Sequence, residues 1–440
     1  MNSQAWFSAE MLGGLAILGL LMMLLIRVPI GIALVTVGMI GNIGFQGLEP
    51  ALIQFQLVIW EVATNFVLVS LPLFIWMGNL AQVSGFGQDL YYGFYRFFGR
   101  MPGGLAVTSV LSSASFGAVT GSSVATVSAM GKMMLPEMQR YRYDMGLASG
   151  SVASAGVLAI LIPPSVPLVF YAAWTETSLG DLFIAGILPG ILLAGLFVLS
   201  IIIRCLLDKT LAPAGETFTW SERLRALPYL LPALSVMLIV LACIYTGVAS
   251  PVESAAIGVL CIFIIGLVRR QLSAHAIRKS LHQSASLSAN IFVLFLGGVF
   301  FSRFMAQTGF IEQQITLLSA WSVSPYVFLF LLVILYLLLG AVLDTFGMII
   351  LTLPFVFPLI VSMGYDPVWF GIFIVMMIEL SLITPPIGIN VFVMQRVASG
   401  VSLMTIFKGC FPFVLVSLFM VALLVCFPEI ALWLPAKMKH

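Results

Sequence analysis

Four polar interruptions within long apolar runs constrain the fold of this chain most strongly. Two are glycine-bearing, at 115–123 and 340–345, and two carry a double proline, at 162–165 and 384–388. A lipid-exposed backbone N–H or C=O that lacks a hydrogen bond is so unfavourable that non-helical backbone at membrane depth persists only where protein buries it or where it lines a cavity. We therefore expect the four interruptions to be buried in the protein or to line a cavity, and to form a binding site.

The composition places the chain in a membrane. Of its 440 residues, 61% are hydrophobic and 8% are charged, which excludes a soluble globular domain. The apolar runs approach the roughly 20 residues that a helix needs to cross a bilayer, so we expect an all-α polytopic membrane protein. The sequence contains no phosphate-binding Gly-x-x-x-x-Gly-Lys motif, and we expect neither a nucleotide cofactor nor a nucleic-acid partner.

The second half of the chain repeats the first. Five residues recur in a single ungapped register, 222 positions later: Pro136, Tyr143, Asp144, Pro163 and Pro164 correspond to Pro358, Tyr365, Asp366, Pro385 and Pro386. The Gly-Ala-Val triplet at 117–119 recurs at 340–342, one residue off this register. Interrupted segments in corresponding positions of two halves are typical of the substrate and ion site of a secondary transporter.

We expect two inverted repeats, at 1–205 and 228–440, joined by a polar cytoplasmic linker at 206–227. Each repeat would contain five crossings and one hairpin that does not cross, and an odd number of crossings inverts the second repeat relative to the first. Each would also contain an amphipathic helix at the membrane interface, at 50–65 and 273–288, because polar residues there interrupt apolar ones at helical spacing.

The hairpins and the broken helices are expected at corresponding positions. The segment 102–140 has two apolar arms of about 15 residues, shorter than a full crossing, which predicts a re-entrant hairpin. A helix broken at the first double proline is expected at 145–174. In the second repeat, the hairpin is expected at 325–362 and the broken helix at 368–397.

The basic residues set the orientation. With both termini outside, 16 of the 19 lysines and arginines fall on the cytoplasmic side, as the positive-inside rule requires. We therefore expect both termini in the periplasm.

The interruptions offer ligands for hard cations, because free carbonyl and hydroxyl oxygens suit such ions, while helix N-termini suit carboxylates. The first candidate site comprises Ser115, Gly117, Thr120, Ser122 and Ser123, facing Pro164 and Ser165. The second comprises Gly340, Asp344 and Thr345, facing Ser381, Thr384 and Ile387. We expect each site to bind a sodium ion, so that the chain uses at least two. The alternative is that these glycines and serines only allow close helix packing.

Three ionisable residues fall within expected membrane segments. Acids in such segments are rare and by default functional, so Asp344 either ligates sodium or carries a proton. Arg303 either binds a substrate carboxylate or forms an ion pair with Glu379 or Asp344. Glu253 stands at the expected start of a helix, where its charge favours the helix N-terminus.

The segments 117–127, 162–165, 343–345 and 384–390 resemble the large membrane subunit of tripartite ATP-independent periplasmic (TRAP) transporters, and the resemblance spans nearly the whole chain. It implies an elevator-type carrier of the ion-transporter superfamily in the bacterial inner membrane. Such a carrier is driven by a sodium gradient and imports an organic acid, including C4-dicarboxylates and sialic acids.

The resemblance also implies partners. A soluble periplasmic binding protein would deliver the substrate, and a small four-helix membrane subunit, encoded as a separate chain, would brace the scaffold within the lipid bilayer. The hairpins and broken helices would move as one block. For the carboxylate substrate we nominate Arg303, Ser165 and Asn390 as binding residues.

Other functions are less consistent with the sequence. A stand-alone sodium- or proton-coupled organic-anion symporter of the same superfamily is the nearest alternative, and a requirement for the binding protein separates the two. An intramembrane enzyme would use Asp344 and Glu379 as an acid pair, but the chain lacks a metal-binding histidine cluster. Closed hairpins also disfavour an ion channel. We therefore expect a transporter and no enzyme.

Overall fold

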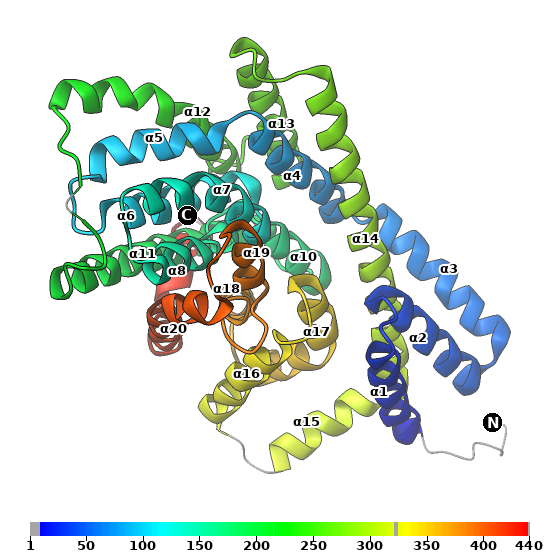
Figure 1. Cartoon of the computed structure of the whole chain (residues 1–440). Coiled ribbons are helices and arrows are strands. Elements are labelled where there is room, and N and C mark those ends of the chain that lie inside the picture. Colours follow the sequence, from blue (N-terminus) through cyan, green and yellow to red (C-terminus); the bar gives the residue numbers. More distant parts are fainter. Residues whose placement is uncertain (1–8, 214, 321–323, 439–440) are drawn as a thin grey trace. The chain divides into compact units, whose positions relative to one another are not determined.

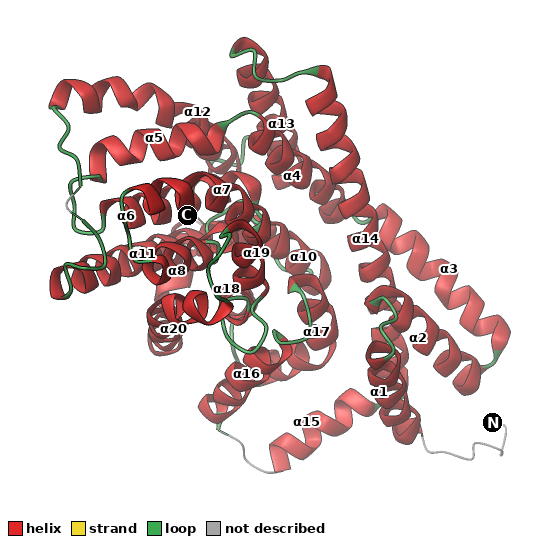
Figure 2. Cartoon of the chain, viewed as in Figure 1, coloured by secondary structure: helices red, strands yellow, loops and turns green. Residues whose placement is uncertain are grey.

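The computed structural model describes residues 9–213, 215–320 and 324–438. Within these ranges the chain forms helices α1 to α21 joined by loops and contains no strand (Figure 2). Eight helices of the described part are long and apolar enough to cross a membrane. The predicted all-α polytopic class is confirmed. Both chain ends, Met1 and His440, lie outside the described residues, so their periplasmic placement stays a prediction.

The chain divides into two compact units, and each contains residues of both sequence halves. Unit 1 takes in 1–66, 286–334 and 346–365, and unit 2 takes in 67–285, 335–345 and 366–440. Unit 1 contains α1 (Ala9–Leu25), α2 (Ile30–Gln46), α3 (Leu48–Thr64) and α15 (Phe310–Ala320). Four further helices have residues in both units: α4 (Phe66–Val83), α14 (Ala274–Gln307), α16 (Pro325–Leu339) and α17 (Thr345–Ser362).

Unit 1 is held together by close approach of α2 and α14. A Cβ added to Gly31 would lie 3.0 Å from the Cα of Leu294, and one added to Gly297 would lie 2.5 Å from the Gly31 carbonyl oxygen. Small residues let helix backbones approach this closely within a membrane. Beside this contact, α1 and α2 form an adjacent pair (Figure 1).

The prediction of a separate interfacial helix at 273–288 is wrong. The sequence predicted an interfacial helix at 273–288 and a separate crossing after it, whereas the structure has a single helix, Ala274–Gln307. The residues around 288 change from polar to apolar but include neither glycine nor proline. Nothing therefore interrupts the i to i−4 hydrogen bonds, and helix propagation continues across the change in composition.

Unit 2 contains the remaining helices. In the first half of the sequence these are α5 (Phe86–Phe98), α6 (Gly104–Thr120), α7 (Ser123–Arg140), α8 (Met145–Ala155), α9 (Leu158–Leu161), α10 (Val166–Thr175) and α11 (Leu179–Leu207), together with α4 from Val67 onward. In the second half they are α12 (Trp220–Tyr245), α13 (Pro251–Val268), α18 (Pro367–Ser381), α19 (Ile389–Val397), α20 (Leu403–Cys426) and α21 (Glu429–Met438).

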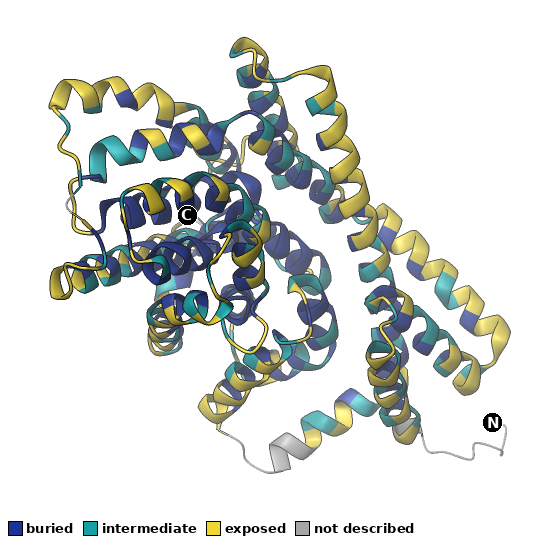
Figure 3. Cartoon of the chain, viewed as in Figure 1, coloured by how far each residue is buried: buried dark blue, intermediate teal, exposed yellow. Residues whose placement is uncertain are grey.

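The core of unit 2 is the interrupted run α8 to α10. In this run, Met145–Thr175, the most apolar stretch is 94% buried. Helices α6 and α18 are also buried along most of their length, as the dark blue ribbons of Figure 3 show. A broken helix at the centre of the unit keeps its free backbone groups away from lipid, as the cost of exposing them requires.

The repeated aspartates cap corresponding helices. The backbone N–H of Leu147 donates to Asp144 Oδ1 (2.8 Å) at the start of α8, and that of Val368 donates to Asp366 Oδ1 (2.7 Å) at the start of α18. Aspartate is among the best N-cap residues because its carboxylate satisfies an unpaired helix N–H. The recurrence of aspartate after 222 residues thus has a local structural reason.

The assignment of Glu253 is confirmed. It stands in the first turn of α13 and forms a capping box with Ser250, whose backbone N–H donates to Glu253 Oε2 (2.7 Å). The reciprocal bond runs from the Glu253 N–H to the Ser250 hydroxyl (3.3 Å). A capping box satisfies two helix donors that would otherwise lack partners.

Candidate functional site

The first glycine-bearing interruption is a tight turn between two helices. Helix α6 ends at Thr120 and α7 begins at Ser123. Gly121 between them has φ of 60°, a left-handed conformation that glycine adopts without steric cost. The Gly121 N–H donates to the Gly117 carbonyl (2.7 Å), and Ser122 caps α7 by accepting from the Ala125 N–H (3.4 Å).

This turn lies against the first double-proline break. A Cβ added to Gly117 would lie 2.3 Å from the Cα of Ala159 on α9, and one added to Gly121 would lie 3.2 Å from the Pro164 carbonyl oxygen. The C-terminal end of α6 therefore meets the start of α10, which begins just after Ser165. Partial negative and positive charges of two helix ends are thereby placed close together.

The side chains at this meeting point provide oxygen ligands. Ser165 is fully buried, and within the described part of the chain its hydroxyl has no hydrogen-bond partner. Thr120 Oγ1 lies 3.0 Å from Thr126 Oγ1, and Ser115 is half-buried on the preceding turn of α6. A buried, unsatisfied hydroxyl beside a free carbonyl fits a hard cation such as sodium. Ser165 and the Pro164 carbonyl would contribute most directly to such a site.

The second interruption is more open. A Cβ added to Gly340 would lie 2.2 Å from the Ser381 side chain, so the C-terminal end of α16 meets the end of α18. The Ser381 and Thr384 hydroxyls donate to helix carbonyls at 2.6 Å, and hydroxyl oxygens are of the ligand type that hard cations prefer. Asp344 is exposed.

Burial therefore differs between the two candidate sites. Pro163 and Pro164 are buried, whereas Pro385 and Pro386 are exposed. Ile387 is 40% exposed, and Thr345 is half-buried. The first double-proline break is thus buried in the protein, whereas the second is exposed. The open second site fits a cation through Asp344, a charged oxygen ligand that the first site lacks at the corresponding position.

Arg303 forms an ion pair that the sequence did not indicate. Its guanidinium donates to Glu61 on α3, and the two side chains are 37% and 51% exposed. The alternative of an Arg303–Glu379 pair is wrong, because among the described residues neither carboxylate oxygen of Glu379 has a partner. Binding of substrate by Arg303 stays a prediction.

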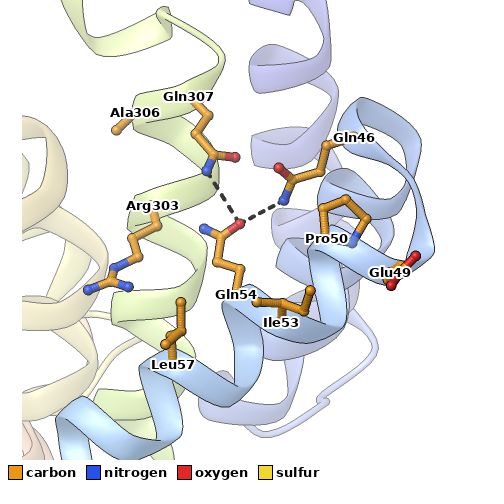
Figure 4. Close-up of a pocket in the computed structure, with 9 residues that line it drawn as sticks. All are labelled: Gln46, Glu49, Pro50, Ile53, Gln54, Leu57, Arg303, Ala306 and Gln307. Carbon is orange, nitrogen blue, oxygen red and sulfur yellow. Dashed lines mark hydrogen bonds between the residues drawn. The ribbon is translucent and has the colours of Figure 1, made fainter.

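A cavity of about 600 Å³ borders Arg303 within unit 1. Figure 4 shows three glutamines on its wall, with Gln54 between the other two. Gln54 Oε1 accepts hydrogen bonds from Gln46 Nε2 (2.8 Å) and Gln307 Nε2 (3.3 Å). The cavity is lined by side chains of α2, α3 and α14, so the pattern of broken helices did not indicate it.

A buried hydrogen bond connects the two sequence halves within unit 2. Asn390 Nδ2, at the start of α19, donates to Ser123 Oγ at the start of α7 (2.6 Å). The sequence placed Ser123 in the first cation site and Asn390 among the substrate residues, and the structure brings these two side chains together. Which ligand each one binds stays a prediction.

Three residues at the first site were not identified from the sequence. A Cβ added to Gly78 on α4 would lie 2.5 Å from the Thr120 carbonyl oxygen, and Ala159 and Thr126 make the contacts described above. Thr126 lies three residues beyond the interruption, just under one helical turn, and this spacing could have indicated it. Ala159 lies in a uniformly apolar run, and Gly78 lies in a mostly apolar run beside Asn79, so neither gives a signal for this particular contact.

Comparison with known proteins places this chain among transport proteins. A family model described as "Tripartite ATP-independent periplasmic transporter, DctM component" matches residues 17–430. The C4-dicarboxylate TRAP transporter large permease protein DctM of Pseudomonas aeruginosa is 32% identical over 378 residues, covering 86% of this chain and 88% of that protein. The sialic acid TRAP transporter large permease protein SiaM of Vibrio cholerae is 28% identical, covering 84% of this chain and 86% of that protein.

A solved structure has a similar fold. The crystal structure of the Alcanivorax borkumensis YdaH transporter aligns with a TM-score of 0.62 at 15% sequence identity, covering 86% of this chain and 88% of that one. At this identity, the similarity concerns the fold alone.

Proposed function

The chain belongs to the tripartite ATP-independent periplasmic transporter family, as a DctM component, and on that premise we propose that it is the transport subunit of a sodium-driven importer of organic acids. It is a multi-pass membrane protein of a transporter family and not an enzyme. In the proposal, it imports a carboxylate across the bacterial inner membrane by an elevator mechanism. A separate small membrane subunit and a periplasmic binding protein complete the system.

One observation supports ion coupling most directly. At the first hairpin tip, the C-terminal end of α6 meets the broken helix beside the buried, unsatisfied Ser165 hydroxyl. The C-terminal end of α6 favours a cation, and the N-terminal end of α10 favours an anion. Bound sodium supplies positive charge at this point, so that a carboxylate binds nearby more favourably. In the proposal, the Ser165 hydroxyl orients the bound sodium and carboxylate where α6 meets α10.

The names of several relatives support the proposed substrate class. Their names refer to C4-dicarboxylates in Pseudomonas aeruginosa and Vibrio cholerae, and to sialic acid in Vibrio cholerae. Both classes carry at least one carboxylate, the group that helix N-termini and arginines recognise. We propose a small carboxylate of one of these two classes as the substrate of this chain.

The proposal predicts that uptake requires three components. Proteoliposomes containing this chain and its co-encoded small subunit should accumulate a labelled C4-dicarboxylate or sialic acid only with both an inward sodium gradient and the binding protein. Choline in place of sodium should reduce uptake to the level of empty vesicles. Uptake that needs no binding protein would instead identify a stand-alone symporter, and uptake driven equally in choline would exclude sodium coupling.

A second prediction concerns Arg303. If its guanidinium binds the substrate carboxylate, Arg303→Ala should raise the KM for uptake about tenfold or more, since hydrogen bonds to charged groups contribute about 1.5–3 kcal/mol. Glu61→Ala should leave the KM close to that of the wild type, because a partly exposed ion pair contributes about 0–1 kcal/mol. As a control, both variants should assemble with the small subunit to the same extent as the wild type. Two results together would show that Arg303 acts only as the partner of Glu61. The KM would rise equally in the two single variants, and it would return to the wild-type value in a double variant that carries Glu at 303 and Arg at 61.

A further inference from the structure

Glu379 on α18 is a buried carboxyl group that forms no ion pair with any described residue. It is 1% exposed, and neither of its oxygens has a hydrogen-bond partner in the described part of the chain. The three ion pairs of that part involve other residues. An ionised carboxylate in such surroundings is strongly unfavourable unless a positive group neutralises it. The carboxyl group of Glu379 is therefore neutralised either by a bound cation or by a proton.

Two polar side chains accompany Glu379. The Ser123 hydroxyl is next to the carboxyl group and accepts from Asn390 Nδ2 at 2.6 Å. Asn390 is fully buried, and its Oδ1 has no partner among the residues described. A Cβ added to Gly156, in the gap between α8 and α9, would lie 3.1 Å from both Asn390 Nδ2 and Ser123 Oγ. Oxygen ligands from α7, α18 and α19 thus converge beside a helix break.

We propose that Glu379, Asn390 and Ser123 form a cation site for sodium between the two sequence halves. All three donors are oxygens, which suit a hard cation, and no cysteine or histidine takes part. One carboxylate is balanced by one monovalent ion, so the buried site becomes neutral when it is filled. The inference rests on the proposed sodium coupling and adds a position supplied mainly by the second half of the chain.

The site would couple ion binding to the packing of unit 2. Helices α7 and α19 also meet at Gly131, where an added Cβ would lie 3.1 Å from Met394 Cε. A cation between Ser123 and Asn390 therefore holds the N-terminal end of α7, the second arm of the first hairpin, against α19. Without the ion, the uncompensated charge of Glu379 weakens this contact. Sodium should accordingly raise the thermal stability of the purified protein.

The test compares Glu379→Gln with the wild type, each purified with the small subunit. Thermal unfolding is measured in sodium chloride mixed with choline chloride at constant ionic strength. The half-saturating sodium concentration for stabilisation should rise at least about tenfold in the variant, because a charged ligand is replaced by a neutral one. In choline alone, the variant should unfold at a higher temperature than the wild type, because it has no buried charge to compensate.

Two further variants make the test specific. Glu312→Gln makes the same chemical change at an exposed position on α15 and should leave the sodium response unchanged. Glu379→Asp keeps the charge and should retain a sodium response weaker than that of the wild type and stronger than that of Glu379→Gln.

The outcomes separate the site from the function. Identical sodium titrations of Glu379→Gln and the wild type, with sodium-dependent uptake intact, would overturn the site alone and indicate that the carboxyl group carries a proton. A wild-type protein without any sodium response, in either unfolding or uptake, would overturn both the site and the proposed sodium coupling.

Discussion

Asp344→Asn is expected to abolish sodium-driven uptake while the protein remains folded. The change removes one negative charge and keeps the shape of the side chain, so a cation loses its charged ligand and a proton loses its carrier. Changes to the environment of a bound metal commonly reduce affinity or activity 10- to 100-fold, and we expect a fall in uptake of about 100-fold. Asp344 is exposed, and a surface substitution usually alters stability by about 0.5 kcal/mol or less.

Asp366→Asn is the matched control. Asp366 caps α18 through the backbone N–H groups of Val368 and Trp369, and asparagine caps helices about as well as aspartate. The control should therefore transport normally. Uptake driven by a sodium gradient and by a proton gradient, measured separately, distinguishes a sodium ligand from a proton carrier. Normal sodium-dependent uptake by Asp344→Asn would remove Asp344 from the mechanism.

Gly117→Ala is expected to disrupt the first candidate site directly. The new methyl group would lie 2.3 Å from the Cα of Ala159, a backbone atom that cannot move without displacing α9. Overpacking of a core usually costs about 1–3 kcal/mol, which exceeds the roughly 0.5–1 kcal/mol that alanine gains over glycine in a helix. The added methyl group should either move the α6–α7 turn away from α9 or lower the stability of unit 2. Uptake should be lost in both cases.

Gly195→Ala on α11 provides the control for this steric argument. No described atom lies within 4 Å of the position that its Cβ would take, so the helix preference of alanine acts alone. Gly195→Ala should transport normally and unfold at the same or a slightly higher temperature. Uptake and thermal unfolding of both variants, in the same membrane preparation, provide the comparison. Wild-type behaviour of Gly117→Ala would mean that the tip does not pack on α9 during transport.

Local chemistry made much of the architecture predictable. Long apolar runs predicted the helices, and the double prolines predicted the breaks between α9 and α10 and between α18 and α19, because proline lacks the donor that a helix needs. The additional break between α8 and α9, at 156–157, was not predicted. The recurrence of Asp144 at Asp366 reflects two helix caps. Glu253 acts within its own first turn. Each of these features depends on residues that are close in the sequence.

The tertiary structure alone decided which helices meet. The partners Arg303 and Glu61 are 242 residues apart, and Asn390 and Ser123 are 267 apart. A helix that is apolar on all sides has no periodic pattern to show which face is buried, so the sequence identified the polar residues without their partners. The deep burial of the first break and the exposure of the second likewise result from packing between distant segments, because the two double prolines are locally alike.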